Sequence, residues 1–139
     1  MYLERIDEWG TSDTSPGASR AQLDACEEVL GHPVPQELRL ILAESDGIVG
    51  EYGEGLVWPV ERIGRDNVVF RSEPSFRELY MPFDGLVFFA DAGNGDQFFV
   101  SLRGNNDVYW WNHEDDSRTW VAPTAMRFLE RYLTGGLEV

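Results

Sequence analysis

The chain has 139 residues, 42% of them hydrophobic, which is enough for one domain with one buried core and no need of a disulfide or metal to hold it together. Its 25 acidic residues against 11 bases, all of them arginine, give a formal net charge of −14. This charge repels nucleic-acid phosphates and anionic membrane surfaces, so the composition argues against both as partners and favours a basic protein. Solubility alone is the alternative explanation of the charge.

The sequence shows no pattern typical of a targeting or membrane-spanning segment. The N-terminus is charged from its fourth residue and lacks the apolar stretch of a signal peptide. The longest apolar run, residues 86–90, is far shorter than the roughly 20 residues that span a bilayer. The single cysteine, Cys26, has no partner for an internal disulfide, which fits a reducing compartment. We therefore expect a soluble, cytoplasmic protein.

The first residues combine a helical pattern with a loop pattern. Residues 1–9 predict a short helix that ends at Gly10, and residues 11–18 predict a loop because serine, proline and glycine are concentrated there. The apolar face expected for this helix consists of Leu3, Ile6 and Trp9.

Two further helices follow. Ser19 and Gln22 have the spacing of a capping box, and the helix that they begin is expected to end at Gly31 in a left-handed turn. Pro35 suits the first position of the next helix, and Gly47 is expected to close it. The apolar faces predicted for the pair consist of Leu23, Cys26 and Leu30, and of Leu38, Ile41 and Leu42.

The second half of the chain changes to strand patterns. Residues 56–58 predict a strand stopped by Pro59, residues 61–70 a helix, and residues from Thr124 to Gly135 a closing helix. The linkers 91–96 and 103–107 carry the glycine and asparagine that hairpin turns require. The strands predicted around them are 86–90, 97–102, 108–112 and 119–122.

This order of elements predicts an α+β fold, with N-terminal helices, an antiparallel β-sheet meander and a C-terminal helix packed together as one domain over residues 1–139. Trp110 and Trp111 are neighbours in a predicted strand, so their side chains face opposite sides of the sheet. We expect one of the two rings to be a core residue.

Motifs for catalysis or cofactor binding are not found. The sequence has no nucleophile elbow, no P-loop and no glycine-rich dinucleotide fingerprint. Cys26 lies on the apolar face of a predicted helix, which indicates a structural thiol, and His32 lies in a connection between helices. We therefore predict no catalytic residue, no metal ligand and no cofactor.

Two acidic clusters have the composition of a cation site. Residues 91–96 superficially resemble a calcium loop, but the segment is shorter than the twelve-residue EF-hand loop and has no terminal bidentate acid, so a hairpin turn explains it better. His113 precedes three acids at a spacing that matches no zinc pattern, so we interpret this segment as a solvated turn.

Acidic loops beside the sheet are the predicted partner-binding surface, because loops carry binding residues more often than strands do. The loops after the first and third strands of the meander are expected at the same end of the sheet. Keeping the protein soluble is the alternative role for each of these acids. The candidate residues are Glu51, Glu54, Asp91, Asp96, Glu114, Asp115 and Asp116.

Several short stretches occur in the order typical of one known family. They are Leu30-Gly31 with Val34-Pro35, Leu38 through Leu42 to Asp46-Gly47, residues 57–61, residues 88–91 with Gly93, Gly95-Asp96 and Phe98-Phe99, residues 108–111 with His113-Glu114, and residues 121–129. In these stretches the chain resembles the SUKH superfamily of toxin-immunity domains, which also includes fungal cell-wall-synthesis regulators. The resemblance covers roughly residues 19–133.

The resemblance implies a non-enzymatic protein that binds and neutralises a toxin, often a nuclease, with the acidic surface complementary to the toxin's basic one. Two other functions remain open. The chain could be a general scaffold or regulator like the fungal branch, or, less favoured, a metal-dependent hydrolase built on the acidic clusters.

Overall fold

The computed structural model describes residues 1–10 and 12–137 and confirms the α+β class. Its helices are α1 (Tyr2–Trp9), α2 (Arg20–Leu30), α3 (Gln36–Glu44), α4 (Val60–Ser72), α5 (Pro74–Leu79) and α6 (Ala125–Leu133). Its strands are β1 (Ser12–Thr14), β2 (Ile48–Gly50), β3 (Gly55–Val57), β4 (Leu86–Asp91), β5 (Gln97–Ser101), β6 (Val108–Asn112) and β7 (Ser117–Ala122).

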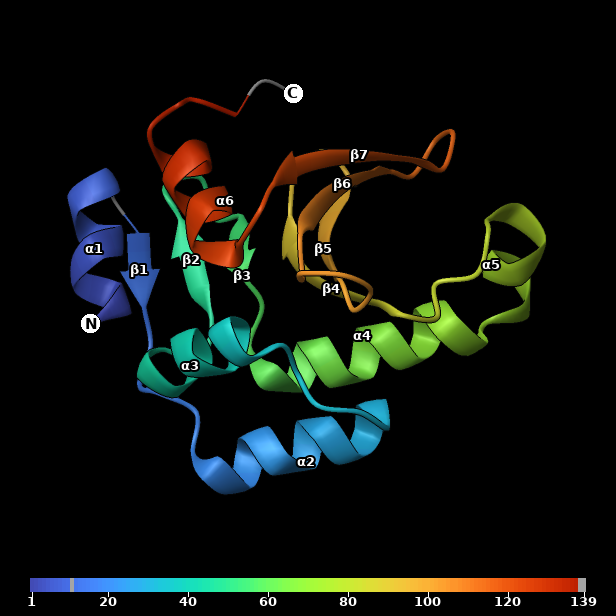
Figure 1. Ribbon diagram of the computed structural model, residues 1–139, viewed down its shortest axis with the longest axis horizontal. Helices are drawn as coiled ribbons and strands as arrows, with labels where there is room; N and C mark the ends of the chain where they lie inside the picture. The colour runs from blue at the N-terminus through green and yellow to red at the C-terminus, as the bar shows by residue number, and fades with distance from the viewer. Residues whose placement is uncertain (11, 138–139) are drawn as a thin grey trace.

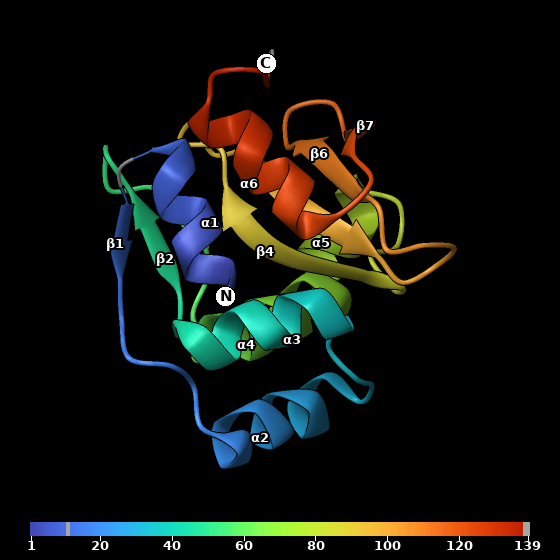
Figure 2. The ribbon, with the colours of Figure 1, turned by 60° about the vertical axis from the view of Figure 1, so that its left-hand side comes forward.

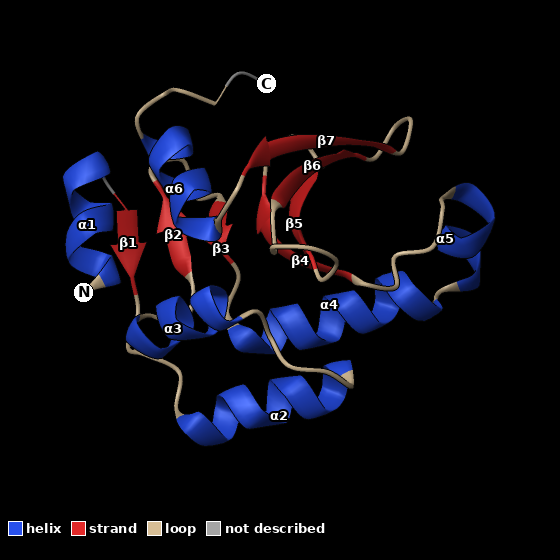
Figure 3. Cartoon of the chain, viewed as in Figure 1, coloured by secondary structure: helices blue, strands red, loops and turns tan. Residues whose placement is uncertain are grey.

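All strand pairs are antiparallel. Strands β1–β2–β3 form a three-stranded sheet, and β4–β5–β6–β7 form the predicted meander, which curls strongly from β4 to β7 (Figure 3). The backbone N–H of Trp58, just after β3, donates to the carbonyl of Phe89 in β4 at 2.7 Å. This bond brings the end of the small sheet against the first strand of the large one, and the β4–β5 pairing shifts register between Phe88 and Ala90.

The helices lie in layers around the sheets. α4 runs along β4, and α2 lies on the other side of α4 (Figure 1). α1 and α6 lie side by side and cover another part of the sheets (Figure 2), where the ring of Phe128 contacts Phe98 and Phe89 at centroid distances of 4.5 and 5.5 Å. The buried apolar side chains form one cluster, and its largest fully buried members include Trp58, Phe88, Phe89, Phe98 and Phe128.

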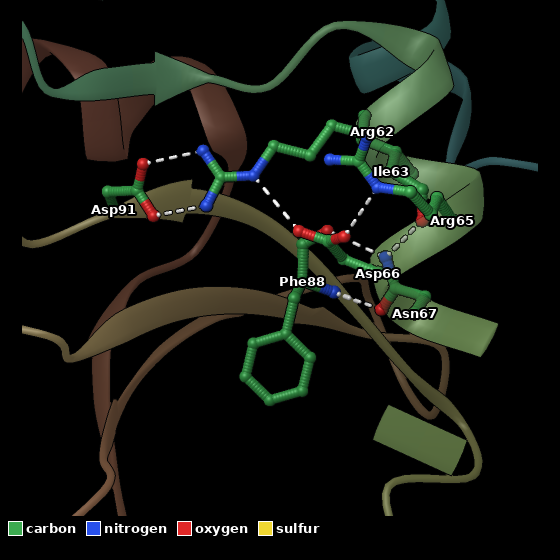
Figure 4. Close-up of polar contacts among 7 residues, drawn as sticks. All are labelled: Arg62, Ile63, Arg65, Asp66, Asn67, Phe88 and Asp91. Atoms are coloured by element: carbon green, nitrogen blue, oxygen red, sulfur yellow. Dashed lines mark hydrogen bonds and ion pairs between the residues drawn. The ribbon is translucent and has the colours of Figure 1, made fainter. Parts of the chain in front are cut away.

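A buried asparagine joins α4 to β4. The Asn67 Nδ2 donates to the carbonyls of Phe88 at 2.9 Å and Ile63 at 2.7 Å, and its Oδ1 accepts from the Phe88 N–H at 2.8 Å (Figure 4). The side-chain amide therefore satisfies both backbone groups of Phe88 on the side of β4 that faces the helix, as a neighbouring strand would.

The helix boundaries follow the predicted signals closely. Ser19 and Gln22 form the capping box, and Gly31 ends α2 with φ of 82°. α3 begins at Gln36, so Pro35 is its N-cap residue and not the predicted first helical residue, and the helix ends at Glu44 instead of Gly47. It ends early because Ser45 is extended and its hydroxyl donates to the carbonyl of Gly47, while Gly47, with φ of 94°, turns the chain into β2.

Three short elements correct the sequence interpretation. Residues 12–14 form strand β1, which pairs with β2, instead of the expected loop; Thr11 of that predicted loop lies outside the described residues. β2 and α5 were not predicted at all. Strands of three residues carry too little periodicity to be recognised, and they form here because each pairs with a neighbour.

The helix predicted at residues 61–70 exists and is longer, since Pro59 caps it and Glu73 ends it. The four meander strands and the closing helix are confirmed, with boundaries moved by at most two residues. Trp111 is buried and Trp110 is partly exposed, so one of the neighbouring rings is a core residue, as predicted. None of the described helices has both the length and the apolarity that crossing a bilayer requires.

Candidate partner-binding site

An open groove of about 670 Å³ lies where the β2–β3 turn, the β4–β5 loop and α6 meet. Its acidic members are Glu54, Asp91 and Asp96, and Tyr52 and Tyr132 add two aromatic rings. Acids from two of the loops singled out in the sequence therefore face one cavity. The other lining residues are Gly53, Ala92, Gly93, Asn94 and Gly95.

Glu54 connects the β2–β3 turn to α6. Its Oε1 accepts from the backbone N–H of Tyr52 and its Oε2 from the hydroxyl of Tyr132, both at 2.9 Å. Among the described residues these donors are neutral, so the negative charge of Glu54 is not cancelled by a cation. Burial, together with the adjacent Glu54 carboxylate, raises the pKa of Tyr132 to about 12. The pair thus presents a carboxylate beside a phenol that keeps its proton at neutral pH.

Asp91 is paired within the protein. Both its oxygens accept from the guanidinium of Arg62, at 2.8 and 2.9 Å, and Arg62 also donates to Asp66 at 3.1 Å (Figure 4). The same guanidinium lies 3.9 Å above the ring of the buried Trp58. A Cβ on Gly55 would come within 2.9 Å of Asp91 and 3.0 Å of Trp58, so only glycine allows this close approach. Asp91 therefore contributes shape to the groove and little net charge.

Asp96 is a structural residue inside the loop. It is 4% exposed and accepts from the His113 backbone N–H at 3.0 Å, from the indole N–H of Trp110 at 3.2 Å, and lies 2.6 Å from His113 Nδ1. These bonds join the β4–β5 loop to the β6–β7 turn and confirm that both loops lie at one end of the sheet. Both carboxylate oxygens of Asp96 already accept hydrogen bonds within the chain, so neither is free to bind a partner.

The three consecutive acids of the β6–β7 turn differ in their surroundings. Asp116 accepts from the indole of Trp111 at 2.8 Å, from Arg118 at 3.0 Å and from the Met81 N–H at 3.0 Å. Burial by itself raises the pKa of Asp116, but these hydrogen bonds outweigh it and hold the pKa below its ordinary value.

The other two acids of this turn, Glu114 and Asp115, are exposed, and Asp115 accepts only the local N–H of Ser117 at 2.9 Å among the contacts described. Glu51, in the β2–β3 turn, is exposed as well. The seven predicted acids therefore divide into two structural groups, the buried Asp96 and the partly buried Asp116, an internally paired group, Asp91, and four that a partner can reach.

The sequence interpretation missed the aromatic part of the groove. Tyr52 is 86% exposed at the tip of the β2–β3 turn, between Glu51 and Gly53. The sequence does contain a signal for this residue: an aromatic side chain between acids and glycines in a turn is expected to be exposed, because no apolar neighbours are present to bury it. Exposed tyrosines are enriched among residues that dominate binding energy at protein interfaces.

The candidate nucleophile Cys26 and the histidine His32 lie outside the groove. Cys26 is buried on α2, and burial raises the pKa of its thiol to about 11, so the thiolate is scarce at neutral pH. His32 Nε2 faces Arg71 at 2.8 Å in a connection between helices. Within residues 1–10 and 12–137, no three or more His, Cys, Asp or Glu side chains are arranged to hold a metal ion.

Comparison with known proteins gives one family. Residues 17–131 match the model of the SMI1 / KNR4 family (SUKH-1), which is not a known enzyme family. No curated protein matches the chain. The matched segment contains α2 through β7 and most of α6, and with them both loops that border the groove and all of its lining residues except Tyr132.

Proposed function

Because the chain belongs to the SMI1 / KNR4 family (SUKH-1), a family of immunity-like and regulator-like domains, we propose that it neutralises a basic toxin of the nuclease type by binding it directly, without catalysis. The observation that carries the proposal is the groove between the β2–β3 turn, the β4–β5 loop and α6, where Glu54, whose charge no cation among the described residues cancels, lies beside the exposed Tyr52.

The charges of the groove suit a basic segment of the partner. A nuclease surface is basic because it binds phosphates, and the −14 charge of this chain attracts such a surface over long range. At close range, the Tyr52 ring offers a face to an arginine or lysine side chain, and Glu54 lies in the same groove to receive its charge. Exposed Glu114 and Asp115 in the adjacent turn extend the acidic rim.

The direct test is co-purification with the product of an adjacent toxin gene, followed by stopped-flow association kinetics across a salt series. The groove variant is Glu51→Gln with Glu54→Gln, which keeps hydrogen-bonding capacity and changes the net charge by two. The matched control is Glu28→Gln with Glu78→Gln, an equal charge change at exposed positions on α2 and α5. Rim charges act mainly on the association rate and its salt dependence.

We expect the groove variant to associate about tenfold more slowly and with a flatter salt dependence than the control, on the basis that steering charges alter rates by such factors. Equal rates for the two variants would remove the groove from the interface. Absence of any complex with the toxin would contradict neutralisation and favour a regulator that binds other cellular proteins.

A further inference from the structure

A second cavity, of about 260 Å³, lies at the far end of α4, away from the acidic groove. It is enclosed by the last turn of α4, by α5 and by the linker that leads to β4, and α5 projects at one end of the molecule (Figure 1). Its lining residues are Phe70, Arg71, Phe76, Arg77, Tyr80, Met81, Pro82, Phe83 and Asp84.

The walls of this cavity are aromatic. Phe70 lies 5.6 Å from Phe76 and 5.9 Å from Phe83, and Tyr80 lies 5.8 Å from Phe83, measured between ring centroids. At the mouth, Met81 is 69% exposed although it is apolar. An exposed methionine beside an aromatic cavity is typical of a surface that accepts an apolar group.

Two arginines at this cavity form no ion pair with an acid among the described residues. Arg71 donates to the carbonyls of Leu30 and Leu86 and to His32, and Arg77 donates twice to the carbonyl of Arg71. Both guanidinium groups thus use neutral acceptors in the described part of the chain, although acids outnumber bases 25 to 11.

Arg71 is only partly compensated by an acid. Its Nε is buried and has no hydrogen-bond partner among the described atoms; burial lowers the pKa of the group, and the charge of nearby Asp84 raises it by less. Desolvating a guanidinium is unfavourable unless an anion compensates. Asp84, also in the lining, is exposed, so the three charged side chains of the cavity sum to one positive charge in a strongly acidic protein.

We propose that this cavity binds an apolar carboxylate, a compact aromatic or aliphatic group that carries one carboxylate. The apolar part lies among Phe76, Tyr80 and Phe83, and the carboxylate accepts from Arg77, whose Nη1 is left free by the two bonds to Arg71. The volume is slightly below the roughly 300 Å³ at which pockets for drug-sized ligands begin, so the ligand has the size of one amino acid.

This chemistry has two sources, a free small acid and the C-terminal residue of a peptide. The probes are 3-phenylpropionate, its neutral analogue 3-phenylpropanol, and a pentapeptide ending in phenylalanine with either a free or an amidated C-terminus. Binding is followed by NMR of the backbone amides of residues 70–84 and of the Trp111 indole, because the Trp111 ring lies 5.0 Å from Tyr80 and 5.4 Å from Phe83.

We expect saturable shifts in these signals, with 3-phenylpropionate at least tenfold tighter than the alcohol. A peptide source is indicated if the free-acid pentapeptide binds more tightly than 3-phenylpropionate, and a small-acid source if it binds more weakly. In both cases the amidated peptide is weaker than the free acid by a similar factor.

Variants separate the charge from the fold. Arg77→Gln should reduce the affinity for 3-phenylpropionate about tenfold, to that of the alcohol, as expected for loss of a charge-assisted hydrogen bond. Arg77→Lys should retain most of the affinity, which shows that a loss in Arg77→Gln does not come from unfolding of α5. The matched control is Arg20→Gln, the same charge change at a side chain that is 91% exposed on α2.

Equal affinity for the acid and the alcohol would overturn the proposal. So would shifts centred outside residues 70–84, or an equal effect of Arg77→Gln and Arg20→Gln.

Discussion

Replacing Asn67 with alanine removes the side chain that joins α4 to β4. The variant loses three hydrogen bonds of 2.7–2.9 Å and leaves the N–H and the carbonyl of Phe88 without their helix-side partner. Asn67 is 1% exposed, so water cannot replace the amide without entering the core. A buried backbone group left unsatisfied costs about 1–3 kcal/mol, so two such groups predict a loss of about 2–6 kcal/mol in the free energy of unfolding.

The measurement is urea unfolding followed by tryptophan fluorescence, with the free energy obtained by linear extrapolation. The matched control is Asn105→Ala, the same substitution at an exposed loop position, for which we expect a change below about 0.5 kcal/mol. If Asn67→Ala destabilises no more than this control, Asn67 does not hold the helix to the strand.

Asn67→Asp tests the same bonds through their polarity. The carboxylate still accepts from the Phe88 N–H, but it faces the carbonyls of Phe88 and Ile63, to which the amide donated. Burial and these carbonyls disfavour the charged form, so the folded-state pKa is raised above that of the unfolded chain. Stability is therefore highest below the unfolded pKa and falls as pH rises through the folded one. A pH-independent loss would contradict this reasoning.

Three further predictions follow from single residues. Trp111→Ala should lower the free energy of unfolding by about 3–5 kcal/mol, because it removes a buried ring whose indole also donates to Asp116. Trp110→Ala removes a partly exposed ring and should lower it by less. Equal, small losses for the two variants in urea melts would contradict the strand assignment. Tyr132 should ionise near its pKa of about 12, which absorbance measures, and Glu54→Gln should lower that pKa. The contribution of Tyr132 to the free energy of unfolding is therefore full below about pH 10 and is lost as pH rises toward the pKa of the folded state. The Cys26 thiol should not react with a disulfide reagent at about pH 8 until the protein is unfolded, since it is buried and its pKa is about 11; a fast reaction in the native state would refute this.

The elements that the sequence predicted well are those with local signals. The capping box of Ser19 and Gln22 and the left-handed Gly31 depend only on residues within one turn, and the structure contains them. β1 and β2 have no such signal, because a three-residue strand exists only through its partner: Asp13 pairs with Val49, thirty-six positions along the chain. Long-range pairing of this kind is invisible to periodicity.

The candidate site shows the same division. The acidic loops after β4 and β6 were predictably close together, because alternate turns of a meander lie at the same end of the sheet. The pairing of Asp91 with Arg62 was not predictable, since Arg62 comes from α4 and reaches the strand through the packing of that helix on β4, to which Asn67 contributes hydrogen bonds. The cavity around Arg77 was also missed, because α5 was not predicted.

The structural role of two acids follows from the neighbouring tryptophans of β6. Consecutive strand residues face opposite sides, so the indole N–H groups of Trp110 and Trp111 need acceptors on opposite sides of the sheet. Asp96 supplies one from the β4–β5 loop, and Asp116 supplies the other from the β6–β7 turn. These two acids are therefore explained by the fold, without a partner.

The exposed acids have no such explanation within the fold. Glu51, Glu114 and Asp115 are exposed, and their carboxylates satisfy no indole of the sheet. Neutralising Asp116 together with its two neighbours would mix loss of stability with loss of binding, because Asp116 fixes both Trp111 and Met81. A variant limited to Glu114→Gln and Asp115→Asn leaves those contacts intact. A change in association rate for that variant then reports on the binding surface alone.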